Sequence, residues 1–289
     1  MKKYVIYSKC LSNGFEDIVD EKTYNELSQS KEILFEARSK ENIYNIILMN
    51  YYEFEQELFK ILLNNEIFNS SYQNFNDYSS KIEQRILNLL SAITLYMDSF
   101  KFEESIEKYP KSLINEFAMV DKYIKNTQKN DKKIKIMKFL RNHIQHNGLL
   151  IENFSLNGVN LTDKLREQTV KFHMDKNKIK ANWFKVENFI DIEDEIDLKK
   201  SIREYMDFIS NVHSHFREVT NMKILSSRES FEDIIKKYDK YKYLFVAEKD
   251  NTGKVDEISI LLDWDNVRIE MTNKNRVPKS FKRHSINTK

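Results

Sequence analysis

A cluster of polar residues lies near the middle of the chain, where positions 141–146 read RNHIQH, directly before Asn147-Gly148. A half-buried helix ordinarily spreads its polar residues, but here a guanidinium, two imidazoles and two amides follow closely on one another. Arg carries a permanent charge and a planar fork that binds phosphate oxygens. His titrates near neutral pH and can move protons. These residue types together predict chemistry on a phosphate ester.

Helix geometry indicates how the cluster can act. Asn142 and His146 are four residues apart, so they share a helix face and the amide can fix the imidazole tautomer. Arg141 and His146 are about 140° apart around the helix and about 7.5 Å apart along its axis, which a long Arg side chain can bridge. We therefore expect Arg141 to bind the phosphate, His146 to act as acid or base and Asn142 to orient His146. His143 and Gln145 are candidates for assisting groups.

These groups suit RNA cleavage by the neighbouring 2′-hydroxyl. A base removes the 2′ proton, an acid protonates the leaving 5′ oxygen, and a cation stabilises the charge that develops on the phosphate. The sequence therefore predicts a metal-independent endoribonuclease that uses no cofactor. Because one chain offers one such His, a symmetric homodimer would supply both an acid and a base.

Composition sets the fold class. Apolar residues make up 40% of the chain and charged residues 32%, enough apolar material for a core. Four Gly and two Pro favour long helices over a turn-rich β-sandwich.

Cys10 is the only cysteine, and we find no signal peptide or membrane span, so we expect a cytoplasmic protein that contacts no membrane. The net charge of +2 leaves RNA binding to local patches.

Apolar residues at helical spacing predict a helical bundle. A first helix should span residues 40–64 after an N-cap at Ser39, and Asp77 should cap a second. Pro110 should lie in the first turn of a third helix that buries Leu113, Phe117, Val120 and Ile124. A fourth helix should begin near Asp131, bury Ile136, Leu140 and Ile144, and end at Asn147-Gly148.

A long helix should span residues 194–220, with an apolar heptad seam that packs against the bundle or against a second copy. Alternating residues predict an inserted β-hairpin at residues 168–185, with its turn at residues 175–178. Basic and aromatic residues here can guide RNA, or the lysines can be a solvated strand face. The candidate RNA-binding residues are Lys171, Lys176, Lys178, Lys180 and Trp183.

The two ends of the chain predict further elements. The first ten residues should form a short strand that can join a C-terminal sheet, and residues 15–36 should form a short helix with loops. Residues 229–239 suggest a short helix, and strands are expected at 244–248, 257–263 and 267–271. We thus expect an N-terminal segment at 1–38, a bundle at 39–222 and a small α+β region with a basic tail at 223–289.

The motif resembles that of the HEPN superfamily, in which an Arg is followed directly by a polar residue and then, after four to six residues counted from the Arg, by a His, late in a bundle of four to five helices. Arg141, Asn142 and His146 match this pattern, and the resemblance covers about residues 40–220. It implies a mainly helical HEPN-like bundle, a homodimer, metal-independent ribonuclease activity and a role in anti-phage defence or as a toxin held by a protein antitoxin or inhibitor. Some relatives add an acidic residue from an earlier helix, for which Glu53, Glu57 and Asp98 are candidates.

Other interpretations stay open. Some proteins of this fold are not nucleases, so the chain can instead be a non-catalytic dimerisation module that partners another protein such as a nucleotidyltransferase. His143 and His146 lack the further ligands that zinc requires, and we expect no metal site. Arg166 and His173 also have a suitable spacing, but they lack the amide and the bundle helix, and we reject this pair.

Overall fold

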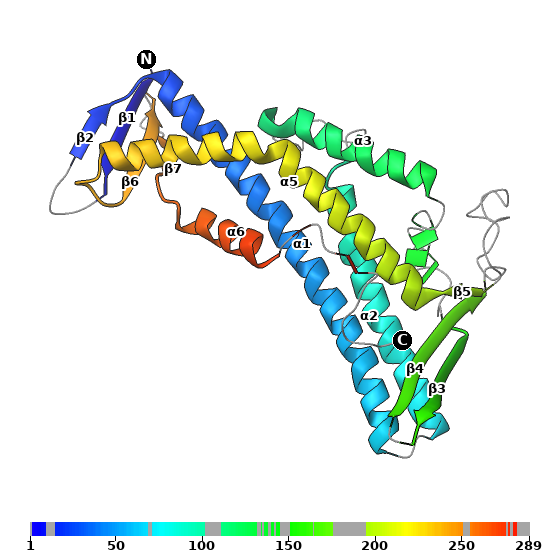
Figure 1. Cartoon of the computed structure of the whole chain (residues 1–289). Coiled ribbons are helices and arrows are strands. Elements are labelled where there is room, and N and C mark those ends of the chain that lie inside the picture. Colours follow the sequence, from blue (N-terminus) through cyan, green and yellow to red (C-terminus); the bar gives the residue numbers. More distant parts are fainter. Residues whose placement is uncertain are drawn as a thin grey trace. The chain divides into compact units, whose positions relative to one another are not determined.

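The chain is mainly helical and carries two small antiparallel sheets (Figure 1). The computed structural model describes residues 2–9, 15–68, 71–101, 111–131, 151–163, 165–175, 195–250 and 255–275, with individual positions between 134 and 144 and at 277, 280 and 281. Among the described helices, none combines the length and apolarity needed to cross a bilayer.

The chain folds into two compact units. Unit 1 comprises residues 1–42, 102–119 and 216–276, and unit 2 comprises residues 43–101, 120–215 and 277–289. The long helices α1 (Glu21–Ile67) and α5 (Leu198–Lys237) contribute residues to both units. The domains expected from the sequence follow one another with boundaries near residues 38 and 222, whereas each compact unit gathers stretches from distant parts of the chain.

Unit 1 contains a four-stranded sheet in the order β2-β1-β6-β7, with all neighbours antiparallel (Figure 1). The strands are β1 (Lys3–Ser8), β2 (Phe15–Ile18), β6 (Leu244–Lys249) and β7 (Val255–Ser259). Val5 of β1 pairs with Ala247 of β6, which confirms that the N-terminal strand joins the C-terminal sheet. The core beneath the sheet includes Ile6, Val246 and Phe231.

Helix α1 begins earlier than the sequence pattern indicated. The Asp20 carboxylate accepts a hydrogen bond of 2.7 Å from the backbone N–H of Thr23, which satisfies a free donor of the first turn. Ser39, the predicted N-cap, lies inside the helix, so that prediction was wrong. The short helix with loops expected at residues 15–36 was also wrong, because β2 and the first turns of α1 occupy this stretch.

Helix α2 (Tyr72–Asp98) is capped by Ser71, not by the predicted Asp77. Ser71 and Asn74 form a reciprocal capping box, in which each side chain accepts from the other's backbone N–H. A short 3₁₀ helix, η2 (Lys111–Leu113), precedes α3 (Ile114–Asn130). The residues predicted to be buried here are confirmed as buried, namely Leu113 at the end of η2 and Phe117, Val120 and Ile124 of α3. Pro110 lies outside the described residues.

A second sheet, in unit 2, has the order β3-β4-β5, formed by β3 (Asn153–Thr162), β4 (Leu165–Asp175) and β5 (Glu195–Asp197). Val170, Phe172 and Met174 are buried, as strand alternation predicted. The hairpin does not lie where the sequence placed it, because β4 pairs with the preceding β3 and the turn falls near residue 163. The predicted second strand, within 176–194, lies outside the described residues.

Helix α5 is longer than predicted and absorbs the separate helix expected at 229–239. Its seam is buried within the chain from Leu198 to Phe216, in agreement with intramolecular packing rather than a seam against a second copy. Residues 267–271, predicted as a strand, belong to helix α6 (Asp263–Lys274). Buried Asp265 explains this, because it accepts hydrogen bonds from Arg268 three residues later, at 2.6 and 2.9 Å, and at 2.6 Å from Arg228 of α5.

Candidate functional site

The predicted catalytic segment is described only in part. Between residues 134 and 144 every described position is helical, and Ile134, Ile136, Met137 and Leu140 are buried. Arg141 and His143 are half-buried, and Ile144, predicted as buried, is also half-buried. Asn142, Gln145 and His146 lie outside the described residues. The structure therefore gives Arg141 and His143 a helical backbone beside a buried apolar stripe, and the spacing of Arg141 to His146 stays a prediction.

Among the candidate RNA-binding residues, Lys171 is described. It is exposed on β4, between the buried side chains of Val170 and Phe172, and its cross-strand partner is Ser155. Lys176, Lys178, Lys180 and Trp183 lie outside the described residues. Lys171 is thus available to a ligand, and whether these residues act together stays a prediction.

The three candidate acidic residues have different surroundings. Glu53 accepts a hydrogen bond of 2.6 Å from the Arg85 guanidinium. Asp98, at the end of α2, pairs with Lys101 at 2.8 Å. It lies thirteen residues beyond Arg85, about 20 Å along the helix axis. Glu57, one turn after Glu53 on α1, is only 9% exposed.

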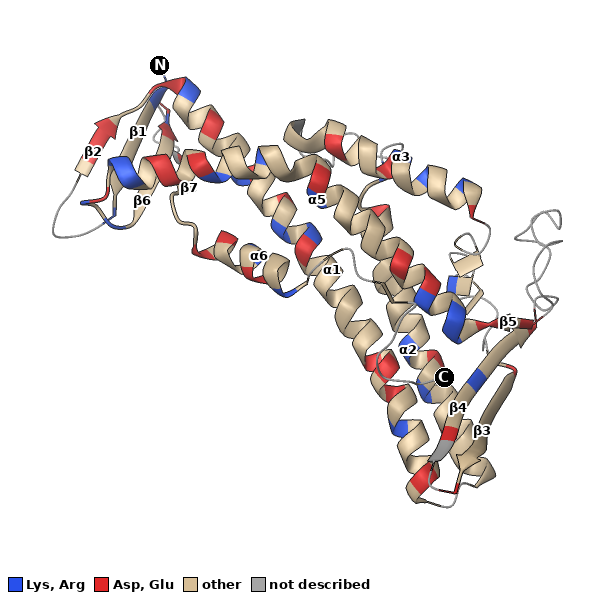
Figure 2. Cartoon of the chain, viewed as in Figure 1, with Lys and Arg blue, Asp and Glu red and all other residues tan. Residues whose placement is uncertain are grey.

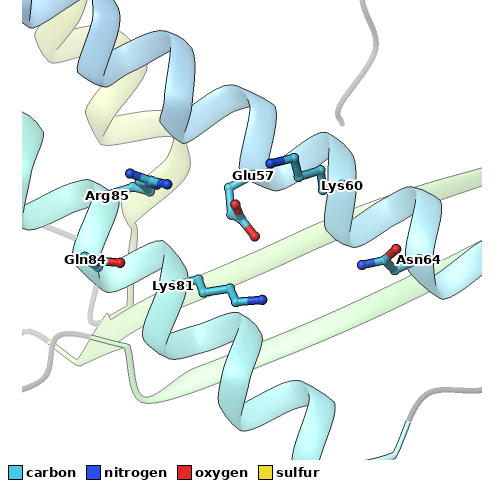
Figure 3. A pocket seen from close by; sticks show the side chains of 6 residues that line it. All are labelled: Glu57, Lys60, Asn64, Lys81, Gln84 and Arg85. Atoms are coloured by element: carbon cyan, nitrogen blue, oxygen red, sulfur yellow. The ribbon is translucent and has the colours of Figure 1, made fainter.

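Glu57 lies at a hollow between α1 and α2 that the sequence analysis did not identify (Figure 3). The hollow has a volume of about 340 Å³. Its lining residues come from one face of each helix, namely Glu57, Lys60 and Asn64 of α1 and Lys81, Gln84 and Arg85 of α2. Their spacings of three, four and seven residues could have indicated two polar helix faces. Sequence alone does not show that the two faces meet.

Further buried polar groups in unit 2 have partners within the fold. Lys199 is 8% exposed and donates a hydrogen bond of 2.8 Å to the Val170 carbonyl, and its burial lowers the pKa of its ammonium group. The buried His213 ring stacks on Tyr44, with centroids 3.8 Å apart, and its Nδ1 lies 2.7 Å from the Tyr96 hydroxyl. Both groups have structural partners, so we place neither in the catalytic site.

Charges of both signs are mixed along the long helices α1, α2, α3 and α5 (Figure 2). Within the described part of the chain, no group of three or more His, Cys, Asp or Glu side chains is arranged to hold a metal ion. Binding of an anionic ligand therefore depends on local groups such as those of the hollow or Lys171.

Comparison with known proteins gives little help with function. No family model matches the chain, and no solved structure matches it. A stretch of 155 residues, 53% of this chain, is 26% identical to part of reticulocyte-binding protein 2 from Plasmodium vivax (strain Belem). The match covers 5% of that protein, so the chain spans a small fraction of its length. This similarity does not bear on the resemblance to the HEPN superfamily, which depends on the 141–146 motif.

Proposed function

We propose that this protein is a metal-independent endoribonuclease of the HEPN type, active as a homodimer. The observation that carries the proposal is the half-buried position of Arg141 on a helix whose other face is buried. A partly desolvated guanidinium binds a phosphate more strongly than one in open water, because the lower local dielectric weakens screening. His143 is half-buried on the same helix and can assist.

In the proposed reaction, Arg141 holds the non-bridging oxygens of the scissile phosphate. One His146 imidazole removes the proton from the 2′-hydroxyl, whose oxygen then attacks phosphorus. The imidazolium of the second protomer's His146 protonates the 5′ oxygen as the bond from phosphorus to that oxygen breaks. The products are a 2′,3′-cyclic phosphate and a 5′-hydroxyl, and no metal or oxidant takes part. Asn142 orients His146, and exposed Lys171, with the basic residues that follow it, guides the RNA.

The test is incubation of purified protein with RNA in the presence of EDTA. We expect cleavage that survives chelation and leaves cyclic phosphate ends. Arg141→Ala and His146→Ala should each lower the rate at least about 100-fold. His173→Ala, from the rejected pair, is the matched control and should keep its activity. Folding of each variant is checked by circular dichroism, and activity lost to EDTA would instead indicate a metal-dependent phosphoesterase.

A second candidate is a non-catalytic dimerisation module, which one feature of α1 favours. Exposed apolar residues recur along the second half of this helix, and contiguous exposed apolar surface is typical of binding sites. They are Ile46, Met49, Tyr52, Phe59, Leu63 and Ile67. An intact dimer that cleaves no tested RNA, and that dissociates in Phe59→Glu, would favour this candidate over the nuclease.

The biological role follows from the nuclease proposal. An RNA-cleaving toxin must be restrained in its own cell, so a protein inhibitor or antitoxin is a fitting partner. Anti-phage defence is the setting that the HEPN resemblance implies. Co-expression with the product of a neighbouring gene, followed by measurement of growth, tests for such an inhibitor.

A further inference from the structure

We propose that the hollow between α1 and α2 is a binding site for a small phosphorylated ligand that carries hydroxyl groups, such as a nucleoside monophosphate. The inference rests on ligand binding at this hollow and does not depend on the proposed nuclease activity. It rests on Glu57, on the two lysines that extend toward it, and on the size of the hollow.

The first observation is the burial of Glu57. Its residue is 9% exposed, and Figure 3 shows its carboxylate pointing into the hollow. Among the residues that the structure describes, none donates a hydrogen bond to this carboxylate or forms an ion pair with it. The carboxylate oxygens of Glu57 are not among the buried side-chain atoms that lack a partner, so they open onto the hollow, and a carboxylate confined in this way gains from a bound donor or a nearby cation. Glu57 is therefore positioned to accept hydrogen bonds from a ligand.

The second observation is the charge around Glu57. Lys60 and Lys81 line the hollow from opposite helices, and both are exposed (Figure 3). Neither forms an ion pair with a described residue. Arg85 differs, because its guanidinium is already paired with Glu53 at 2.6 Å. Two ammonium groups thus remain for an anion, and Lys is a common point-charge ligand of phosphate.

These groups select the chemistry of the ligand. A phosphate between Lys60 and Lys81 would stand close to the Glu57 carboxylate, which repels a bare dianion. A hydroxyl group on the same molecule removes this conflict, because it can donate to Glu57 while the phosphate contacts the lysines. The amides of Asn64 and Gln84 offer both donors and acceptors to the rest of the ligand. A volume of about 340 Å³ is within the range of small-molecule sites.

The test is isothermal titration calorimetry of the full-length protein with three probes: 5′-AMP, adenosine and inorganic phosphate. We expect 5′-AMP to bind at least ten times more tightly than either of the other two. Lys60→Gln and Lys81→Gln should each weaken 5′-AMP binding about tenfold. Lys122→Gln, on an exposed position of α3, is the matched control and should leave binding unchanged.

Glu57→Gln gives the most discriminating result. Loss of the negative charge should strengthen the binding of inorganic phosphate. Because the Gln amide oxygen is a weaker hydrogen-bond acceptor than the Glu57 carboxylate, the preference for 5′-AMP over phosphate should decrease. Equal binding of adenosine and 5′-AMP, or no effect of the lysine variants, would overturn the proposal. So would a short RNA oligonucleotide that binds much more tightly than 5′-AMP and competes with it, because the hollow would then be part of an RNA path. Each readout is binding, so an inactive nuclease does not affect the outcome.

Discussion

The guanidinium of Arg203 donates two hydrogen bonds, each 2.8 Å long, to the carboxylate of Glu55. Both side chains are largely buried, with 14% and 19% of their surfaces exposed. The Tyr51 hydroxyl donates to the same carboxylate at 2.6 Å. The pair links α1 to α5 within unit 2. Because its geometry is bidentate and it is largely buried, we expect it to contribute more to the free energy of unfolding than the exposed ion pairs do.

We therefore predict that Arg203→Met destabilises the protein. The substitution leaves a largely buried carboxylate with the Tyr51 hydroxyl but without its cation, which costs about 3 kcal/mol. Urea denaturation followed by circular dichroism measures the change in free energy of unfolding. Lys22→Ala is the control, because it breaks the exposed pair with Glu26 and should change stability by less than about 0.5 kcal/mol. Equal effects of the two substitutions would contradict the prediction.

The Arg203–Glu55 pair also illustrates what the sequence could not show. Residues 148 positions apart form it, and local spacing carries no sign of such a contact. The same holds for α6, where alternation of Val267, Ile269 and Met271 predicted a strand. The buried ion pair of Asp265 with Arg228 of α5 outweighs that local pattern. Secondary structure was predictable where apolar periodicity and burial agree, as in β1, β4 and the buried face of α3.

In the candidate site, too, some residues could be proposed from the sequence and others could not. Arg141 was a candidate from its neighbours in the sequence, and the structure gives it a helical backbone, while its pairing with His146 stays a prediction. The hollow at Glu57 was not identifiable as a site, although Glu57 was among three acidic candidates. Its lining combines one face of α1 with one face of α2, and local spacing in the sequence does not show that the two faces meet.

The cap of α2 gives a second prediction. Ser71→Ala should lower the free energy of unfolding by about 1 kcal/mol, because the backbone N–H of Asn74 loses its acceptor. Asp77→Ala should change it by less than about 0.5 kcal/mol, since Asp77 lies inside the exposed face of the helix. Thermal and urea denaturation of the two variants decide between the cap that the structure describes and the cap that the sequence suggested. A larger loss in Asp77→Ala would reject the capping role of Ser71.

Alkaline pH should weaken the sheet of unit 1. Burial, followed by the hydrogen bond of 2.5 Å to Glu257, raises the pKa of Tyr7 to about 12, and burial also raises the pKa of Tyr24 to about 12. The neutral phenol is thus favoured in the folded state, while the unfolded chain ionises near the ordinary value of 10.0. The stabilisation is fully present below pH 10 and is lost as the pH rises toward about 12.

Urea denaturation over this pH range should show a declining midpoint, and Tyr7→Phe should reduce the decline. Tyr72→Phe is the control, because Tyr72 is 91% exposed and should leave the pH dependence unchanged. Tyrosinate absorbance in the ultraviolet gives an independent measurement, in which one tyrosine fewer should titrate late in Tyr7→Phe. A late titration that is unchanged in this variant would show that Tyr7 ionises normally.

A substitution of Lys171 can distinguish two interpretations of the basic segment. Its lysines either guide RNA or form a solvated strand face. If Lys171 contacts a phosphate, Lys171→Gln should weaken the binding of single-stranded RNA and reduce the slope of log affinity against log salt by about 0.7. Such a loss should be similar for all RNA sequences, because a phosphate contact reads no bases. A strand-face lysine that serves only solubility would leave both affinity and slope unchanged. Fluorescence anisotropy in the background of His146→Ala, which the proposed mechanism predicts to be inactive, measures binding without cleavage. Lys122→Gln in that background controls for loss of a positive charge elsewhere, and an equal loss in both variants would mean that Lys171 acts only through net charge.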